Sequence, residues 1–251
     1  MHITAIENYK GGVGKTTTAS NLAYELSKMG YHTLLVDMDP QQNSAYLLRA
    51  KKYKKNLEDA LCMRADIKNV IHRCCFSDQM DMLVGGDEMD SLDLNHIDLS
   101  FILDKVRDDY DFCIIDCNPG MTMLTVNALV AADDVIVPLV PDAFGAEGMR
   151  KIKDYIDQAK EYNENIRILG CVATMFNGRS SQIRMIKKIM SENIIPVFDT
   201  CISDSEVVNT ALEKRKPISL HRRKSVVSED YKNLAKEYVR RLGNGEDRIQ
   251  Q

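Results

Sequence analysis

The sequence lacks several features that would place a protein outside the cell or in a membrane. Its seven cysteines are odd in number and include no CxxC pair, which argues against a disulfide framework and a zinc site. No apolar run approaches the roughly 20 residues that a membrane-spanning helix needs, and the first residues lack the order of a signal peptide. No linker rich in Pro, Gly and Ser divides the chain. We therefore expect a cytoplasmic protein with one domain over residues 1–243 and a polar tail at 244–251.

What the chain does have is an uneven distribution of charge. Lys and Arg total 33 and Asp and Glu total 37, so the formal net charge is −4. Residues 1–149 hold 13 basic and 23 acidic side chains, whereas residues 150–251 hold 20 basic and 14 acidic. The net charge of the whole chain does not indicate a polyanionic partner. The net positive charge of residues 150–251 is compatible with one.

Short apolar runs alternate with longer amphipathic stretches along the whole chain. The runs are rich in Val, Ile and Leu and mostly do not alternate with polar residues, as in parallel strands that are covered on both faces. This pattern predicts an α/β fold with a doubly wound, mostly parallel sheet and helices on both faces. The expected strands are 3–7, 33–37, 80–84, 112–116, 135–140, 168–174 and 197–202, and the expected helices lie near 16–29, 98–109, 122–131, 144–162, 180–193, 204–213 and 227–242.

The strongest motif reads YKGGVGKTT over residues 9–17. It follows the first predicted strand and opens the first predicted helix, which is the context that a phosphate-binding loop requires. Glycines let successive backbone N–H groups point at phosphate oxygens, and the helix N-terminus adds the positive end of its dipole. We expect Lys15 to reach the terminal phosphates and Thr16 to ligate Mg²⁺. The motif predicts a P-loop NTPase fold that binds ATP through Lys10, Gly11, Gly12, Val13, Gly14, Lys15, Thr16 and Thr17.

This loop departs from the standard pattern in an informative way. Tyr9 stands where the first glycine is expected, six residues before the lysine, and a second lysine, Lys10, follows it. In this form the loop resembles the deviant Walker A loop of the ParA/MinD family of dimeric ATPases, and the chain is similar to the short chromosomal-type (Soj-like) ParA form over nearly its whole length. The resemblance implies a Mg²⁺-dependent ATPase that is slow and stimulated by a partner. It also implies an ATP-dependent homodimer in which Lys10 reaches the partner's nucleotide.

Two acidic segments agree with this resemblance. Residues 37–42 read DMDPQQ, like the family's D-x-D-P-Q segment, which implies that Asp39 positions the attacking water and that Asp37 supports the metal shell. A helix N-cap is the alternative explanation for either residue. Asp116 ends an apolar strand as a Walker-B-like residue and is expected to hold Mg²⁺, directly or through water. Asn118 stands where the family has the first of two prolines.

The C-terminal part carries two further candidate sites. The segment 174–181 resembles the family's base-binding segment, so Asn177 is predicted to contact adenine, although a turn also accounts for an Asn there. The run 212–224 holds six basic residues and one acidic residue. Six phosphate contacts from each subunit would give strong, salt-sensitive DNA binding without base readout, whereas a solvated basic face is the plainer interpretation. The candidate DNA-binding residues are Lys214, Arg215, Lys216, Arg222, Arg223 and Lys224.

Together these features predict an ATPase that binds DNA nonspecifically. The resemblance implies plasmid or chromosome partitioning with a ParB-like centromere-binding protein, and association with the nucleoid in the ATP-bound state. We expect no stable membrane association, because the last predicted helix carries two tyrosines in a core-packing stripe and the tail is polar. The alternative is a MinD-like ATPase that positions a protein complex or acts at a membrane surface. The first predicted strand begins at about Ile3, so we expect no operator-binding domain ahead of the ATPase.

Overall fold

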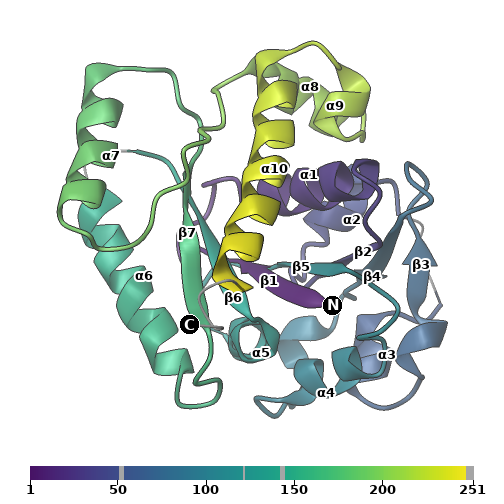
Figure 1. Cartoon of the computed structure of the whole chain (residues 1–251). Coiled ribbons are helices and arrows are strands. Elements are labelled where there is room, and N and C mark those ends of the chain that lie inside the picture. Colours follow the sequence, from purple (N-terminus) through teal and green to yellow (C-terminus); the bar gives the residue numbers. More distant parts are fainter. Residues whose placement is uncertain (51–53, 121, 142–144, 247–251) are drawn as a thin grey trace.

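A seven-stranded sheet runs through the centre of the molecule, with helices packed on both of its faces (Figure 1). The computed structural model describes residues 1–50, 54–120, 122–141 and 145–246. The strand order is β3-β4-β2-β5-β1-β6-β7, in which β3 pairs antiparallel with β4 and the other pairs are parallel. The strands are β1 (His2–Ile6), β2 (Thr33–Asp37), β3 (Ile71–Arg73), β4 (Met80–Val84), β5 (Phe112–Asp116), β6 (Asp134–Leu139) and β7 (Arg167–Ala173).

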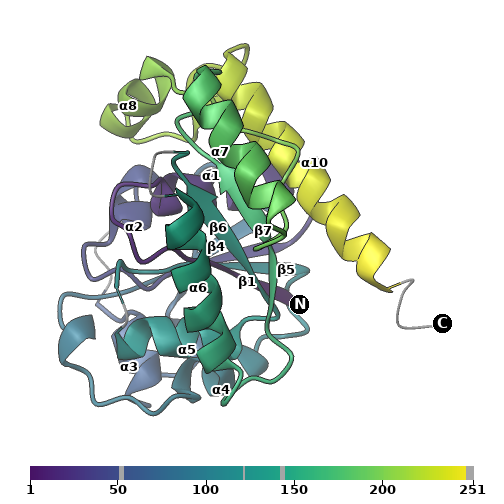
Figure 2. The same ribbon diagram turned by 90° about the vertical axis from the view of Figure 1, so that its left-hand side faces the viewer.

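The helices form two layers, each with its own apolar core against the sheet. Figure 2 shows α10 along the right of the molecule and α6 near its centre, with strands β6 and β7 between the two helices. One layer holds α1 (Lys15–Lys28), α2 (Asn43–Leu47), α8 (Glu206–Glu213), α9 (Ile218–His221) and α10 (Val226–Glu246). The other holds α3 (Leu57–Leu61), α4 (Asp98–Asp104), α5 (Met123–Ala131), α6 (Gly145–Ala159) and α7 (Ser180–Ser191), with short 3₁₀ turns at Ile67–Asn69 and Met89–Ser91.

The predicted doubly wound α/β architecture is confirmed, with local differences. The segment 197–202 is not a regular strand: Val197 forms only an isolated bridge to Cys171, and a second isolated bridge joins Phe176 and Ser203. The backbone of this segment therefore does not form a continuous ladder of hydrogen bonds with β7. Strand β3 and helices α2, α3 and α9 were not predicted, because elements of three to five residues carry too little periodicity. Helix α10 runs through 244–246, past the predicted domain boundary, and the rest of the predicted tail lies outside the described residues.

The topology brings three loops to one edge of the sheet. Strand β1 lies between β5 and β6, so the chain winds in opposite directions on its two sides, and ligands bind at such a switch point. The loops after β1, β2 and β5 all leave from the carboxyl ends of adjacent parallel strands. Helix α1, which follows the first loop, is anchored by fully buried Leu22 and Leu26 against the sheet. The phosphate loop therefore lies between a buried strand and a helix that packs on the sheet.

Candidate active site

The loop between β1 and α1 closes around the Lys15 ammonium. Its Nζ donates to the carbonyl oxygens of Asn8 at 2.7 Å and Lys10 at 3.2 Å, and the Lys10 amide donates to Asn8 Oδ1 at 3.0 Å. Gly12 and Gly14 have φ angles of 75° and 91°, a left-handed conformation that residues with a Cβ rarely adopt. The glycines thus allow the turn, and Lys15 is held within it at only 7% exposure.

Asp37 and Asp116 form a fully buried pair on adjacent strands. Asp37 accepts the amides of Asp39 at 3.2 Å and Ala45 at 2.9 Å. Asp116 Oδ2 accepts the hydroxyl of Ser44 at 2.6 Å, whereas its Oδ1 has no hydrogen-bond partner among the described residues. Burial raises the pKa of both carboxyls, and the charge of Asp116 raises the pKa of Asp37 further. Two ionised carboxylates buried this close together raise the free energy of the folded state unless a positive charge lies beside them.

These residues fit a Mg²⁺ ion. The open Oδ1 of Asp116 is an oxygen ligand of the type that Mg²⁺ takes, and Thr16 stands at the start of α1 beside Lys15. No group of three or more His, Cys, Asp and Glu side chains within the described ranges forms a metal site of its own. That suits Mg²⁺, which usually keeps one or two protein ligands plus phosphate oxygens and water. Both oxygens of Asp37 accept backbone amides, which suits a supporting rather than a ligating role.

Asp39 lies in the loop after β2 and is 7% exposed. Its Oδ1 accepts the amide of Gln41 at 2.9 Å, and its Oδ2 accepts the side-chain amide of Asn43 at 3.3 Å. The N-cap of α2 is Gln42, with φ of 52°, so Asp39 stabilises the turn ahead of the helix and is not itself the cap. Its carboxylate therefore stays at the edge of the sheet where the three loops meet.

Hydrogen bonds of the Asn118 side chain restrain the loop after β5. Asn118 Nδ2 donates to the Thr122 hydroxyl at 3.0 Å, and its Oδ1 accepts the Thr125 hydroxyl at 2.9 Å. The Thr125 hydroxyl also lies 2.8 Å from the carbonyl oxygen of Gly120. Side-chain hydrogen bonds to the first turn of α5 thus restrain this loop where the family pattern has a proline ring.

A pocket of about 200 Å³ opens beside the phosphate loop and was not predicted from the sequence. Asn177 is not among its lining residues: its Oδ1 accepts the Arg179 amide at 3.3 Å. The Thr174 hydroxyl donates to Val13 O at 2.8 Å and ties the loop after β7 to the phosphate loop. The position of the pocket suits a nucleotide base better than the position of Asn177 does. The lining residues are Gly14, Thr17, Thr174, Met175, Ile202, Ser203, Asp204, Ser205, Val208, Asn209 and Tyr231.

Filling this pocket should impair nucleotide binding. Asn209 is an exposed lining residue on α8, and an indole in its place would occupy much of the space. We expect Asn209→Trp to weaken ATP binding about tenfold or more, as measured by fluorescence titration, because the base loses its apolar contacts. Glu206→Trp, on the same helix but outside the pocket, is the matched control, and Asn177→Ala tests the sequence prediction directly. Unchanged affinity in Asn209→Trp would place the base elsewhere.

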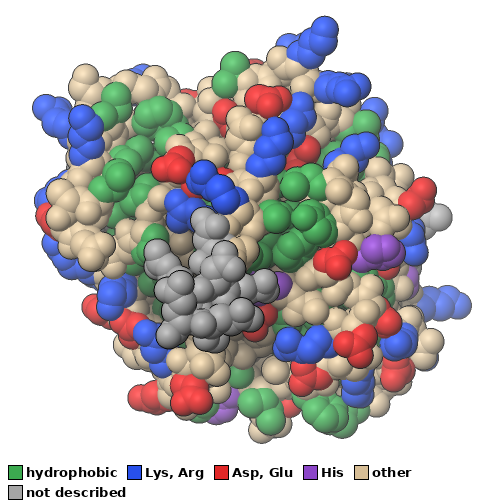
Figure 3. Space-filling model, in the orientation of Figure 1, with side chains coloured by type: hydrophobic (Ala, Val, Ile, Leu, Met, Phe, Trp, Pro, Cys, Tyr) green, Lys and Arg blue, Asp and Glu red, His purple; other side chains and the backbone are tan. Residues whose placement is uncertain are grey.

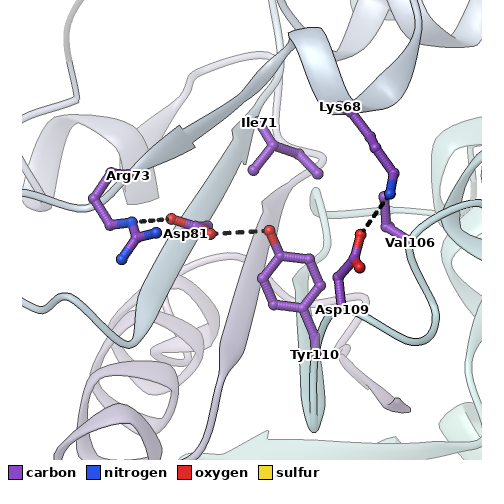
Figure 4. Close-up of a pocket in the computed structure, with 7 residues that line it drawn as sticks. All are labelled: Lys68, Ile71, Arg73, Asp81, Val106, Asp109 and Tyr110. Carbon is purple, nitrogen blue, oxygen red and sulfur yellow. Dashed lines mark hydrogen bonds and ion pairs between the residues drawn. The ribbon is translucent and has the colours of Figure 1, made fainter.

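A second hollow, of about 310 Å³, lies by strands β3 and β4 (Figure 4). Its charges are already paired: Arg73 Nε contacts Asp81 Oδ1 at 2.8 Å, and Lys68 Nζ contacts Asp109 Oδ2 at 2.9 Å. The Tyr110 hydroxyl donates to Asp81 Oδ2 at 3.0 Å. Because its cations are neutralised internally, this hollow does not compete with the phosphate loop as an anion site.

The fold and the phosphate loop define a P-loop nucleotide hydrolase. A family model described as an AAA domain matches residues 1–168. The chain is 32% identical over 246 residues to the sporulation initiation inhibitor protein Soj of Bacillus subtilis, covering 94% of this chain and 97% of Soj. It is 32% identical over 249 residues to the chromosome partitioning protein ParA of Myxococcus xanthus, covering 95% and 88% of the two chains.

Solved structures agree with this assignment. The chain superposes on cobyrinic acid a,c-diamide synthase of Mycobacterium smegmatis, whose structure holds ADP and magnesium, with a TM-score of 0.83, 25% identity and coverage of 97% and 96%. The chain therefore belongs to the ParA/MinD family of P-loop ATPases and is Soj-like. Within the part of the chain that the structure describes, no helix combines the length and apolar character needed to cross a membrane.

Proposed function

We propose that this ATPase is a Mg-ATP-dependent dimerising switch that binds DNA nonspecifically and drives plasmid or chromosome partitioning with a ParB-like partner. The observation that carries the proposal is an exposed basic segment between α9 and α10. Arg222, Arg223 and Lys224 are all exposed there, and within the described residues none of the three pairs with a carboxylate. A relative of similar length is named a chromosome partitioning protein, which supports the same function.

In the nucleotide site, the chain's own residues would bind and orient ATP. Lys15 exchanges its carbonyl partners for phosphate oxygens, and Lys10 completes the site of the second subunit. Thr16 and Asp116 hold Mg²⁺, which, when bound, neutralises charge that develops on the phosphates. Asp39 orients the attacking water. Hydrolysis is slow until the partner protein completes the arrangement of charges around the transition state.

The basic surface extends beyond the segment predicted from the sequence. A groove of about 480 Å³ lies beside Arg223 and is also lined by Lys28 of α1 and by Lys232 and Lys236 of α10. Glu25 lines it too, and Lys232 pairs with Glu229 at 3.1 Å, so Lys28, Arg223 and Lys236 carry most of its positive charge. Figure 3 shows Lys and Arg side chains along the upper part of the molecule, over the α8–α10 end. Neutralising phosphates at several such positions is the main source of nonspecific DNA affinity. Lys28 lies on α1 and Lys232 and Lys236 lie on α10, all outside the run 214–224, so a search for basic runs missed them.

The first part of the predicted basic run has a different environment. The guanidinium of Arg215 lies 4.5 Å from the centroid of the Tyr46 ring, and its Nε donates to the Tyr46 carbonyl at 2.8 Å. Arg49 in turn donates to the carbonyls of Lys214 at 2.9 Å and Arg215 at 3.0 Å. Lys216 is half-buried. The segment 214–216 is therefore attached to α2, and we propose 222–224 as the principal DNA contact.

Asp39→Ala is expected to separate ATP binding from hydrolysis. Removing the carboxylate leaves Lys15 and the phosphate loop intact, so we expect ATP to bind within about threefold of the normal affinity while hydrolysis falls at least a hundredfold, in the range for loss of a group that positions a reactant. Size-exclusion chromatography with ATP should then show a persistent dimer. Asp87→Ala, a nearby exposed acidic residue, is the control. A monomeric Asp39→Ala protein in saturating ATP would contradict the assigned role.

A further inference from the structure

An apolar surface lies exposed where α4 begins. Ile97 and Phe101, one helical turn apart, are 59% and 51% exposed, and Lys105 lies one turn further on, 4.9 Å from the centroid of the Phe101 ring. Tyr162, which follows α6, is 51% exposed and stacks on His96 with the ring centroids 4.2 Å apart. We call His96, Ile97, Phe101 and Tyr162 the α4 face. Exposed apolar side chains that gather in one patch mark interaction sites, whereas single ones do not.

The charged side chains that border the α4 face are mostly acidic. Asp93, Glu161 and Glu164 are exposed next to it in the sequence, and among the described residues none of the three forms an ion pair with Lys or Arg. Lys160, which is also close, is already paired with Asp157 at 2.6 Å. The α4 face therefore suits a partner surface that is both apolar and basic.

Helix α7 presents that combination of side chains. Ile183, Lys187 and Met190 follow one another at helical spacing on its outer side, where Ile183 is 39% and Met190 58% exposed. Arg184 and Lys187 are exposed as well, and neither pairs with a carboxylate within the ranges that the structure describes. We call Ile183, Arg184, Lys187 and Met190 the α7 face. Its apolar and basic side chains complement the apolar and acidic surroundings of the α4 face.

The two faces lie at opposite ends of the molecule. In Figures 1 and 2, α7 is at the top of the view and α4 is at the bottom. Figure 3 shows hydrophobic side chains beside Lys and Arg at the α7 end, and further hydrophobic side chains at the lower edge. The α7 face of a molecule therefore cannot reach its own α4 face. Contact between two different patches of identical chains is head-to-tail, and it adds copies in one direction unless a ring closes.

We propose that the α7 face of one copy docks on the α4 face of a second copy, so that this protein associates with itself head to tail. The apolar side chains of the two faces bury one another, and the charges of Arg184 and Lys187 meet those of Glu161 and Glu164. Neither face includes the phosphate loop or the segment 222–224. The contact is therefore separate from the proposed ATP-dependent dimer and from the proposed DNA contact, and it needs no nucleotide.

Sedimentation velocity of the full chain without nucleotide, over a series of protein concentrations, tests this contact. The normal protein should form dimers and then larger species as its concentration rises. Arg184→Glu with Lys187→Glu, or Glu161→Lys with Glu164→Lys, should weaken self-association about tenfold or more, because like charges then face each other. Combining all four substitutions exchanges the charges and should restore association to within about threefold of normal.

The matched control for the α7 pair is Lys54→Glu with Lys55→Glu, which changes the net charge equally at exposed positions ahead of α3. This control should associate like the normal protein. An equal loss in the control would mean that net charge alone governs association, which contradicts the proposal. Circular dichroism should show the same helix content in every variant, since all the changed side chains are exposed.

Serine variants test the geometry of the contact. Ile183→Ser with Met190→Ser disables only the α7 face, and Ile97→Ser with Phe101→Ser disables only the α4 face. Each protein alone should stay monomeric. Their equimolar mixture should form pairs and nothing larger, because each pair has used the one intact α7 face and the one intact α4 face. A symmetric contact would instead leave one of the two variants able to pair with itself.

Several results would overturn the inference. One is a normal protein that remains monomeric at about 1 mM, where even a weak contact is half occupied. Another is a mixture of the two serine variants that forms no pairs, which decides the matter if the fourfold charge exchange does not fold. A third is an α7 charge variant that keeps normal self-association but loses retardation of duplex DNA, because the α7 face would then serve DNA and not a second copy.

Discussion

Lys15→Ala is expected to abolish ATP binding at concentrations that saturate the normal protein. Its ammonium is the one buried cation inside the phosphate loop, within the described residues, and phosphate oxygens would take the place of the carbonyls of Asn8 and Lys10 as its partners. Removing one member of a buried charge pair costs about 2–5 kcal/mol, which corresponds to a loss of affinity between about 30-fold and several thousandfold. Equilibrium dialysis with labelled ATP measures this loss of affinity.

The comparison variant is Lys28→Ala, at the far end of the same helix, where the side chain is exposed. It should bind ATP like the normal protein, because it lies outside the phosphate loop. Circular dichroism should show the same helix content in both variants, since the backbone of α1 stays anchored by Leu22 and Leu26. Tight ATP binding by a folded Lys15→Ala protein would refute the site.

Reversing the charges at Arg222, Arg223 and Lys224 to Glu should eliminate DNA retardation while leaving ATP-dependent dimerisation intact. Each subunit loses three potential phosphate contacts and gains three negative charges at an exposed surface. Because each neutralised phosphate contributes about 0.9 to the slope of log affinity against log salt, the slope should fall by about 3 for each subunit. Gel shifts with arbitrary duplex DNA at several salt concentrations measure both the DNA affinity and its dependence on salt.

A triple change of equal charge tests whether position matters. Lys105, Lys153 and Lys160 are exposed on α4 and at α6, on the opposite layer of the sheet, and their replacement by Glu should leave DNA binding within about threefold. Equal losses of DNA affinity in the two triple variants would mean that net charge alone determines DNA binding. Unchanged retardation in the 222–224 variant would move the DNA site, and binding to anionic vesicles in place of DNA would favour the MinD-like alternative.

Much of the fold was predictable because each long element carries its own signal. Strands β2 and β5 are unbroken apolar runs ending in Asp37 and Asp116, and Gly12 and Gly14 mark the turn into α1. The segment 197–202 is also partly apolar and was predicted as a strand, but it contains Asp199 and Thr200, and it pairs only through the isolated bridge of Val197 to Cys171. Strand β3 was missed for the opposite reason, since its three residues have no pattern to detect.

The candidate site was predictable where residues are adjacent in the sequence. The phosphate loop is one such run, and its lysine, glycines and threonines lie together in the structure as expected. The role of Ser44, which bonds Asp116 across 72 positions, depends on the β2–β5 pairing and has no signal in the sequence. The pocket beside Gly14 is lined by residues from four separate segments of the chain, so it forms only when the chain folds.

The two edges of the sheet have a consequence for self-assembly. At one edge, β3 is only three residues long and carries the ion pair of Arg73 with Asp81, and at the other the irregular segment 197–202 lies along β7. Short, charged or covered edges resist strand-to-strand growth between molecules. If the proposed DNA binding holds, copies gathered on one DNA molecule would gain from this protection, because crowding would then not lead to aggregation. In the proposed dimer, contacts between copies would therefore form at surfaces other than these two edges.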